Sequence, residues 1–200
     1  MKKIFFLIFL LAMAVPSISQ TLSEEDYALL RDITSKTNSI KSFTCSFTQQ
    51  RQDPLLEEPS ISKGQMQYRN DGTVVWKCIS PESYQLTILK DRVIFASGGK
   101  NRTINMSSGK MTGSLQKLVD DISSGSAFAQ PDNFKVSVIR GKSSVSVRLE
   151  PVKKILQKHI SSVTMRFFSD NLLIDNFMYS TPEGGSTTIS FSDWKIEWND

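Results

Sequence analysis

The sequence from Ile61 to Ile79 is ISKGQMQYRNDGTVVWKCI, and it sets the architecture of the whole chain. Apolar and polar side chains alternate along both halves of this stretch, which is typical of strands with one buried face. Between the halves lies Asn70-Asp71-Gly72, and Asp-Gly supplies the positive φ angles that tight hairpin turns require. The stretch therefore predicts a β-hairpin with strands at about 61–69 and 73–79.

The same period of two recurs on both sides of this hairpin. Upstream, Phe43, Cys45 and Phe47 alternate with small polar residues. Downstream, further strands are predicted at about 83–90, 92–97, 100–106, 134–140, 143–150, 160–168, 171–180 and 185–194. Eleven consecutive antiparallel strands twist too far to stay flat, so the sheet is expected to curl into a barrel or a strongly bent half-barrel.

Two helices accompany the strands. Ser23 is a hydroxyl N-cap, and three acidic residues follow it in the first turn of the first helix. The apolar stripe predicted for this helix consists of Tyr27, Leu29, Leu30, Ile33, Thr37 and Ile40. A second short helix is predicted at about 112–123, because Leu115, Leu118, Val119 and Ile122 follow a helical spacing. Both helices are expected to cover the interior of the curled sheet.

The N-terminus has the parts of an export signal. Two lysines precede an apolar run from Ile4 to Val15, which is too short to cross a hydrocarbon core of about 30 Å. Ser17 and Ser19 occupy the minus-three and minus-one positions, where a signal peptidase requires small side chains. We therefore expect a signal peptide over residues 1–19. No cysteine directly follows the apolar run, so a soluble mature protein without a lipid anchor is expected.

Composition and charge fit an ordinary globular domain. Of the 200 residues, 39% are hydrophobic and 22% are charged. The formal charge of +4 falls to +2 without the two lysines of the signal, since 22 Lys and Arg then face 20 Asp and Glu. A charge this small in an exported protein argues against a nucleic-acid partner. About 180 residues is a usual length for one domain, so a single domain over 20–200 is expected.

Residues suited to catalysis are sparse. His159 is the single histidine, and no cluster of His, Cys and carboxylates has the spacing of metal ligands, so neither a metal nor a cofactor is expected. There is no Gly-x-Ser-x-Gly motif. Asp120 and Asp121 are neighbours on the second predicted helix, so their side chains diverge instead of facing each other. We expect no enzymatic activity. Lys153, Lys154 and Lys158 are interpreted as a solvated loop, with an anionic membrane or acidic partner as the alternative.

The two cysteines, Cys45 and Cys78, both fall on inward-facing positions. The inferred register sets Cys45 near Tyr68 and Cys78 near Gly64, on strands that a third strand separates. A disulfide needs Cα atoms within about 7 Å, which non-adjacent strands rarely provide. Two buried free thiols are therefore predicted.

The inward faces predicted by alternation are rich in large side chains. They carry Phe43, Phe47, Met66, Tyr68, Val74, Trp76, Leu86, Ile88, Phe95, Met106, Met165, Phe167 and Phe177. In one interpretation these residues form an ordinary core. In the other they line a cavity for an acyl chain or a lipidated partner, since Met and aromatic side chains adapt to varied shapes. Composition alone does not separate the two.

Several of these features together resemble the LolA family of periplasmic lipoprotein carriers. They are the signal peptide, the capped first helix, the stretch FTCSFTQQ at 43–50, the strand SKGQMQYR at 62–69, and Trp76 twelve residues after Gly64. The order of one helix, six strands, one helix and five strands covers the whole mature chain.

The resemblance implies a mainly β fold, an eleven-stranded antiparallel incomplete (unclosed) barrel with an N-terminal helix and a short helical lid over an apolar cavity. The implied ligand-binding residues are Phe43, Phe47, Met66, Tyr68, Trp76, Leu86, Ile88, Phe95, Met165 and Phe167. The implied lid residues are Leu115, Leu118, Val119 and Ile122.

The resemblance also implies a function. A monomeric periplasmic carrier, or chaperone, would receive lipidated outer-membrane lipoproteins from an inner-membrane ABC-type lipoprotein-releasing complex and pass them to an outer-membrane acceptor. Two alternatives share the fold. One is a lipid-binding sensor or regulatory module, as in anti-sigma regulators with LolA-like domains, and the other is a carrier of another envelope lipid.

One departure from the family pattern concerns the lid latch. In the family the second strand usually ends in Arg-Pro, and this arginine holds the lid to the barrel. Here Arg69 precedes Asn70, one position short of the usual spacing from Gly64, and alternation points it away from Met66 and Tyr68. Arg69 is assigned as the lid latch as a hypothesis, with a solvated strand-end arginine as the alternative.

Overall fold

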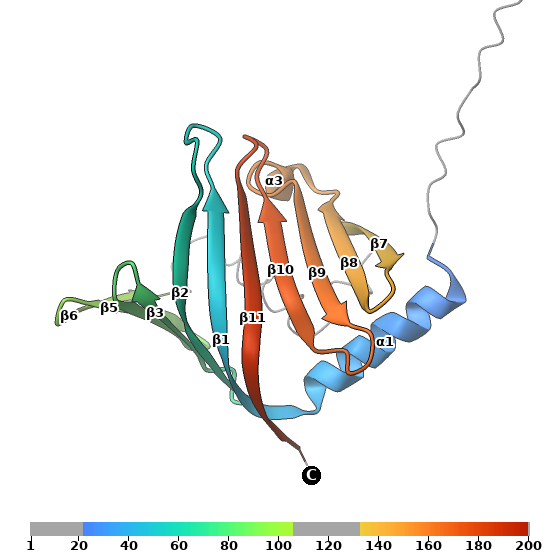
Figure 1. The fold of residues 1–200 in the computed structure, drawn as a ribbon, viewed down its shortest axis with the longest axis horizontal. Helices are drawn as coiled ribbons and strands as arrows, with labels where there is room; N and C mark the ends of the chain where they lie inside the picture. Colours follow the sequence, from blue (N-terminus) through green and yellow to red (C-terminus); the bar gives the residue numbers. More distant parts are fainter. Residues whose placement is uncertain (1–21, 106–132, 200) are drawn as a thin grey trace, which may run out of the picture.

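The computed structural model describes residues 22–105 and 133–199. One large antiparallel sheet dominates this part of the chain (Figure 1). Its strands are β1 (Ile40–Gln52), β2 (Ser60–Arg69), β3 (Val74–Ser80), β4 (Tyr84–Ile88), β5 (Arg92–Ser97), β6 (Lys100–Asn105), β7 (Phe134–Arg140), β8 (Ser144–Pro151), β9 (Ser162–Phe168), β10 (Ile174–Ser180) and β11 (Ser186–Trp198). The helices are α1 (Glu24–Asn38) and α3 (Lys154–Gln157).

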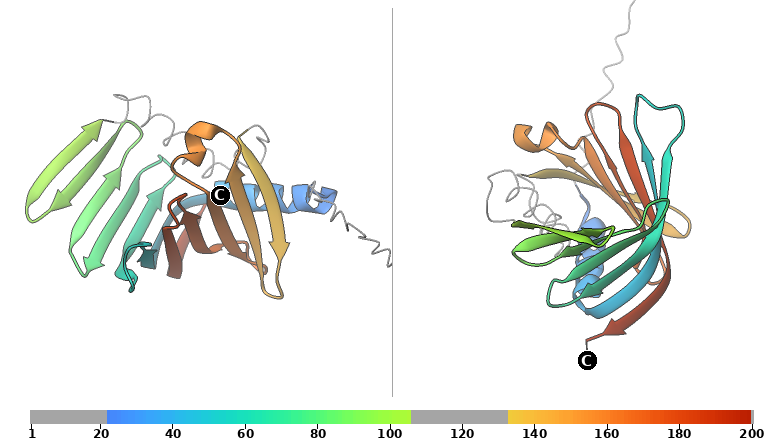
Figure 2. Two further views of the ribbon diagram at one scale, coloured as in Figure 1. Left: turned by 90° about the horizontal axis from the view of Figure 1, so that it is seen from above. Right: turned by 90° about the vertical axis from the view of Figure 1, so that its left-hand side faces the viewer.

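The strand order is β6-β5-β4-β3-β2-β1-β11-β10-β9-β8-β7. The two meanders β1–β6 and β7–β11 are therefore joined side by side through the β1–β11 pair. The sheet curves strongly without closing, since β6 and β7 lie at opposite edges (Figure 2). The prediction of an eleven-stranded, mainly β, unclosed barrel with an N-terminal helix is confirmed.

The hairpin at 61–79 forms as predicted. Gly72 has φ 86°, and its amide donates a hydrogen bond to the carbonyl oxygen of Arg69 at 2.9 Å. The carboxylate of Asp71 accepts a hydrogen bond from the amide of Thr73 at 2.9 Å. The turn therefore fixes the register in which Tyr68 faces Val74 and Met66 faces Trp76.

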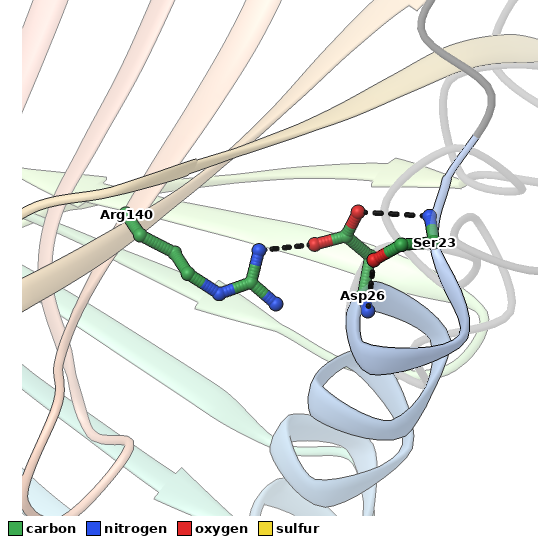
Figure 3. A network of polar contacts seen from close by, with 3 residues as sticks. All are labelled: Ser23, Asp26 and Arg140. Carbon is green, nitrogen blue, oxygen red and sulfur yellow. Dashed lines mark hydrogen bonds and ion pairs between the residues drawn. The ribbon is translucent and has the colours of Figure 1, made fainter.

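Helix α1 begins at the expected cap, with a reciprocal contact that the sequence analysis did not predict. The Ser23 hydroxyl accepts from the amide of Asp26 at 3.1 Å, and the Asp26 carboxylate accepts from the amide of Ser23 at 3.0 Å. The same carboxylate pairs with Arg140 at the end of β7, so it also ties the helix to the sheet (Figure 3).

The predicted stripe of α1 needs two corrections. Ile40 does not belong to the helix but opens β1, because the helix ends at Asn38 and the chain turns at Ser39. Tyr27 is 43% exposed, so it lies at the margin of the buried face. Leu30 and Ile33 form the centre of that face.

Three elements differ from the predictions. Strands β1 and β11 are each 13 residues long. Strand β1 extends on both sides of the predicted alternation of Phe43, Cys45 and Phe47, and β11 continues past its predicted end at 194. A one-turn helix, α3, stands where a loop was expected around Lys154. The lid predicted at 112–123 and the signal peptide predicted at 1–19 lie outside the described residues. No helix in the described part of the chain is both long and apolar enough to cross a bilayer.

Asp26 should give the protein a measurable acid sensitivity. Burial alone would raise the pKa of this carboxyl, but hydrogen bonds from Ser23 and the contact with Arg140 outweigh it and hold the pKa below its ordinary value of 3.8. A lowered pKa adds stability above the unfolded-state value, and this stability is lost as pH falls through the folded-state value. Asp26→Asn should therefore cost about 1 kcal/mol at pH 7 and less below pH 4.

Urea unfolding of wild type and Asp26→Asn between pH 3 and pH 7 measures this difference. Asp175→Asn is a matched control, because it also removes a carboxylate paired with an arginine, Arg166, without touching a helix cap. A difference between wild type and Asp26→Asn that stays constant with pH would contradict the prediction.

Candidate functional site

One face of the sheet, here called the inner face, is largely apolar from β7 to β5, and at the β6 edge it carries Lys100 and Arg102. It is the face that α1 covers, since Leu30 and Ile33 share a buried cluster with Val147, Leu149 and Met165. Directly opposed residues of adjacent strands lie on the same face. The register therefore carries this face from Met165 across β10 and β11 to Phe47, and from Phe47 through Gly64 into β3 and β4.

The inner face is divided into two halves that differ in packing. In the half under α1, the central side chains are fully buried: Val147 and Leu149 are 0% exposed, Met165 is 3% and Phe167 is 5%. The other half, here called the wing, consists of β2–β6. The buried cluster around α1 contains none of the residues of the wing.

The wing presents a broad apolar surface that is only partly covered. Six of the residues predicted to bind ligand lie here. Five are half-buried, namely Met66, Tyr68, Trp76, Leu86 and Ile88, and the sixth, Phe95, is 36% exposed. They lie on the inner face together with half-buried Phe43 of the adjoining β1, as the register shows. Met165 and Phe167, also predicted as ligand-binding, lie instead in the packed half under α1. The structure thus brings most of the predicted residues together and separates two.

Phe47 connects the packed half with the wing. It is 2% exposed, and its ring stacks on Trp76 with centroids 3.7 Å apart. The ring of Phe47 crosses β2 over Gly64, where a Cβ atom would lie 2.6 Å from its Cζ. Gly64 is therefore a glycine because the aromatic stack occupies the space of a side chain. The spacing of Gly64 and Trp76 in the sequence has this packing as its physical basis.

A second aromatic group lies on the same face. Phe43 stacks on Tyr68 with centroids 5.3 Å apart and meets Trp194 edge-on at 5.0 Å. Trp194 also contacts Phe191 at 5.8 Å. Neither Trp194 nor Phe191 is among the residues predicted for the inner face. From Phe191 onward, strict alternation assigns Trp194 to the polar outer face, and only an irregularity in the pairing of β11 returns it to the inner face.

Both cysteines are buried and free, as predicted. Cys78 faces Gly64, as expected, but Cys45 faces Met66 and not Tyr68, so the predicted register of the β1–β2 pair was wrong by two residues. Burial raises the pKa of Cys45 to about 12, which makes it an inert apolar side chain at neutral pH.

Arg69 has the environment of a strand-end arginine. Its side chain is 70% exposed and pairs with Asp71 at 3.1 Å. It alternates with Tyr68, which is on the inner face, so it lies on the outer face. The lid residues Leu115, Leu118, Val119 and Ile122 lie outside the described residues, so the latch role of Arg69 stays a prediction that this position does not favour.

The described residues contain no group of three or more His, Cys, Asp or Glu side chains arranged to hold a metal ion. Two hollows lined by described residues lie away from the inner face. One, beside α3, is lined by Pro151, Val152, Ile160 and Pro182 with Lys135 and Glu150 among others. The other opens on the outer face and is lined mainly by polar residues of β1, β2 and β11. Neither matches the extent of the inner face, which we therefore take as the candidate site.

No family model matches the chain, and no curated protein is significantly similar to it in sequence. Among solved structures, MucB aligns with a TM-score of 0.53 and 12% identity, over 89% of this chain and 61% of the MucB chain. A chain of the Pseudomonas aeruginosa MucA/MucB complex aligns with a TM-score of 0.52 and 11% identity, over 88% of this chain and 58% of that one. The chain thus spans less than two thirds of the length of MucB.

A LolA superfamily protein from Nitrosomonas europaea, NE2245, aligns over 84% of this chain and 93% of its own, with 10% identity and a TM-score of 0.40. At such identities the similarity concerns the fold alone. The two MucB chains, whose TM-scores exceed 0.5, show that this chain shares the fold of MucB.

Proposed function

We propose that this protein is a periplasmic carrier that shields the acyl chains of lipoproteins on the inner face of its wing and moves them from the inner to the outer membrane. One observation supports this most directly: the inner face is continuous, but among the described residues its large side chains are fully buried mainly under α1 and at Phe47, and only partly buried across most of the wing. A wing that served solely as core would be expected to bury Leu86 and Trp76 as fully as Leu149.

The physical argument rests on the cost of exposed apolar surface. Each methylene transferred from water to an apolar surface gains about 0.8 kcal/mol, so acyl chains lying on the wing would bury both themselves and the side chains beneath them. Large contiguous apolar patches on soluble proteins usually mark binding sites. On β2, Lys63, Gln65 and Gln67 lie on the outer face and Gly64, Met66 and Tyr68 on the inner face, so along this strand the inner face offers acyl chains the more apolar surface.

The proposed route has a donor and an acceptor. An inner-membrane ABC-type lipoprotein-releasing complex would load the carrier, and an outer-membrane acceptor would unload it. Export by the signal peptide over residues 1–19 belongs to the same proposal, as does action as a monomer without a cofactor.

The test is direct binding of a synthetic diacylated lipopeptide, followed by recovery of natural cargo. The purified mature protein should keep the lipopeptide in solution after detergent removal, as a complex seen by native mass spectrometry. Protein recovered from periplasm should carry lipidated peptides. Failure to hold the lipopeptide would refute the proposal, and recovery of phospholipid alone would favour a carrier of another envelope lipid.

The match to MucB supports a second candidate function, a lipid-binding regulatory module. One of the matching solved structures is a complex of MucA with MucB. A regulator would bind a partner protein with an affinity that changes when lipid is present, whereas a carrier would release its lipid to membranes that hold the acceptor. Co-purification with and without the lipopeptide distinguishes the two.

A further inference from the structure

The indole nitrogen of Trp194 is a buried donor without a partner. Nε1 is covered from solvent and has no hydrogen-bond acceptor among the described residues. Buried tryptophans usually find an acceptor for this N–H group, because leaving it unpaired forfeits the hydrogen bond it made with water. Native structures leave few such groups unpaired, so each one calls for a physical reason.

A β-bulge places Trp194 on the inner face. Ser46 faces Ser192 and Thr44 faces Lys195, so two residues of β11 stand opposite the single residue Cys45. The extra residue is Asp193, which takes a left-handed backbone conformation with φ 55°. Without this irregularity Trp194 would alternate with Phe191 onto the polar outer face. Bulges that re-aim a side chain are frequent beside functional sites.

The neighbours of Trp194 are apolar rings of the inner face. Phe43 lies 5.0 Å and Phe191 lies 5.8 Å from its ring, centroid to centroid. Phe43 in turn stacks on Tyr68 of the wing. Trp194 as a whole is only half-buried, so part of its side chain is open to a ligand, and a ligand reaches Nε1 itself once the side chains that cover it move aside.

We propose that Nε1 of Trp194 donates a hydrogen bond to an acyl carbonyl oxygen of the ligand, which deepens the proposed carrier function and rests on it. An indole N–H is a donor only, so its partner has to be an acceptor. An acyl chain is apolar except at the carbonyl that joins it to glycerol or to an amino group. The ligand class is therefore an acyl ester or amide, in preference to an alkyl ether of the same length.

The test uses two ligands and two variants. The ligands are a synthetic lipopeptide with two ester-linked acyl chains and its dialkyl ether analogue of equal chain length. Trp194→Phe keeps an aromatic ring and removes the donor. Trp198→Phe is the control on the same strand, because Trp198 lies under the Lys36 ammonium at 3.9 Å and is 38% exposed.

Wild type and Trp198→Phe should bind the ester about fivefold to tenfold more tightly than the ether, which is the scale of one hydrogen bond. Trp194→Phe should bind both ligands equally, at the affinity of wild type for the ether. In ¹⁵N-labelled protein the indole N–H signal of Trp194 should shift on binding the ester and shift less on binding the ether.

The other outcomes each overturn a distinct claim. If wild type binds both ligands equally, or if Trp194→Phe still prefers the ester, the hydrogen bond is wrong and the carrier function stands. If Trp194→Phe weakens both ligands by the same factor, Trp194 is an apolar contact only. If wild type binds neither ligand, the carrier function fails and this inference fails with it.

Discussion

Gly64→Ala is expected to destabilise the protein by about 3 kcal/mol, the upper range for overpacking a core. A Cβ atom at this position would lie 2.0 Å from the carbonyl oxygen of Lys77 and 2.6 Å from Cζ of Phe47. The oxygen belongs to the backbone of β3, so it can move only if the β2–β3 pair opens. Phe47 can move only by leaving the Trp76 ring.

Urea unfolding followed by tryptophan fluorescence, to which Trp76, Trp194 and Trp198 all contribute, measures the loss. Gly98→Ala is the control for backbone strain without steric overlap: its φ is 55° and a Cβ atom there meets nothing within 4 Å, whereas Gly64 has no left-handed φ and its loss arises from overlap. This control isolates the cost of a left-handed alanine, about 1 kcal/mol. Equal losses for the two variants would show that the sheet absorbs the extra carbon and that the stack over Gly64 is not rigid.

Gly64 also illustrates what the sequence predicts and what it leaves open. Period-two alternation located all eleven strands, because a strand with one apolar and one polar face has a local signal that needs no knowledge of its neighbours. The turn at Gly72 was predictable as well, because the residues of a tight turn are also a local signal. The Gly64 to Trp76 spacing was visible as a pattern, but its cause, a ring crossing a neighbouring strand, appears only when β1, β2 and β3 are assembled.

The misses follow from features that alternation does not encode. Trp194 was missed because one bulge residue, Asp193, shifts the phase of every later side chain in β11. The partner of Cys45 was misassigned because a shift by two residues preserves which face is apolar. The contrast between Leu149 and Leu86 was invisible for a third reason. Both look alike in sequence, and only the position of α1 over one half of the sheet makes one of them core.

The difference in burial between Leu149 and Leu86 leads to the second prediction, because the same leucine-to-alanine substitution can be made in both halves of the inner face. Leu149→Ala should cost about 4 kcal/mol of unfolding free energy, since Leu149 is 0% exposed and its loss leaves a cavity. Leu86→Ala should cost about 1 kcal/mol, since Leu86 is half-buried and has fewer contacts to lose. Affinity for a diacylated lipopeptide should show the opposite order: nearly unchanged for Leu149→Ala while it is folded, and about tenfold weaker for Leu86→Ala.

A binding surface is distinguished from a core because the loss of stability and the loss of affinity rank the two variants in opposite orders. A residue that contributes mainly to folding loses stability when truncated, and a residue kept partly open for ligand loses affinity, so the two losses together classify each half of the sheet. Urea unfolding and lipopeptide titration at a temperature where both variants are folded supply the two measurements. If Leu86→Ala proved as destabilising as Leu149→Ala and bound the lipopeptide as wild type does, the wing would be ordinary core, and the apolar inner face would have to serve folding alone.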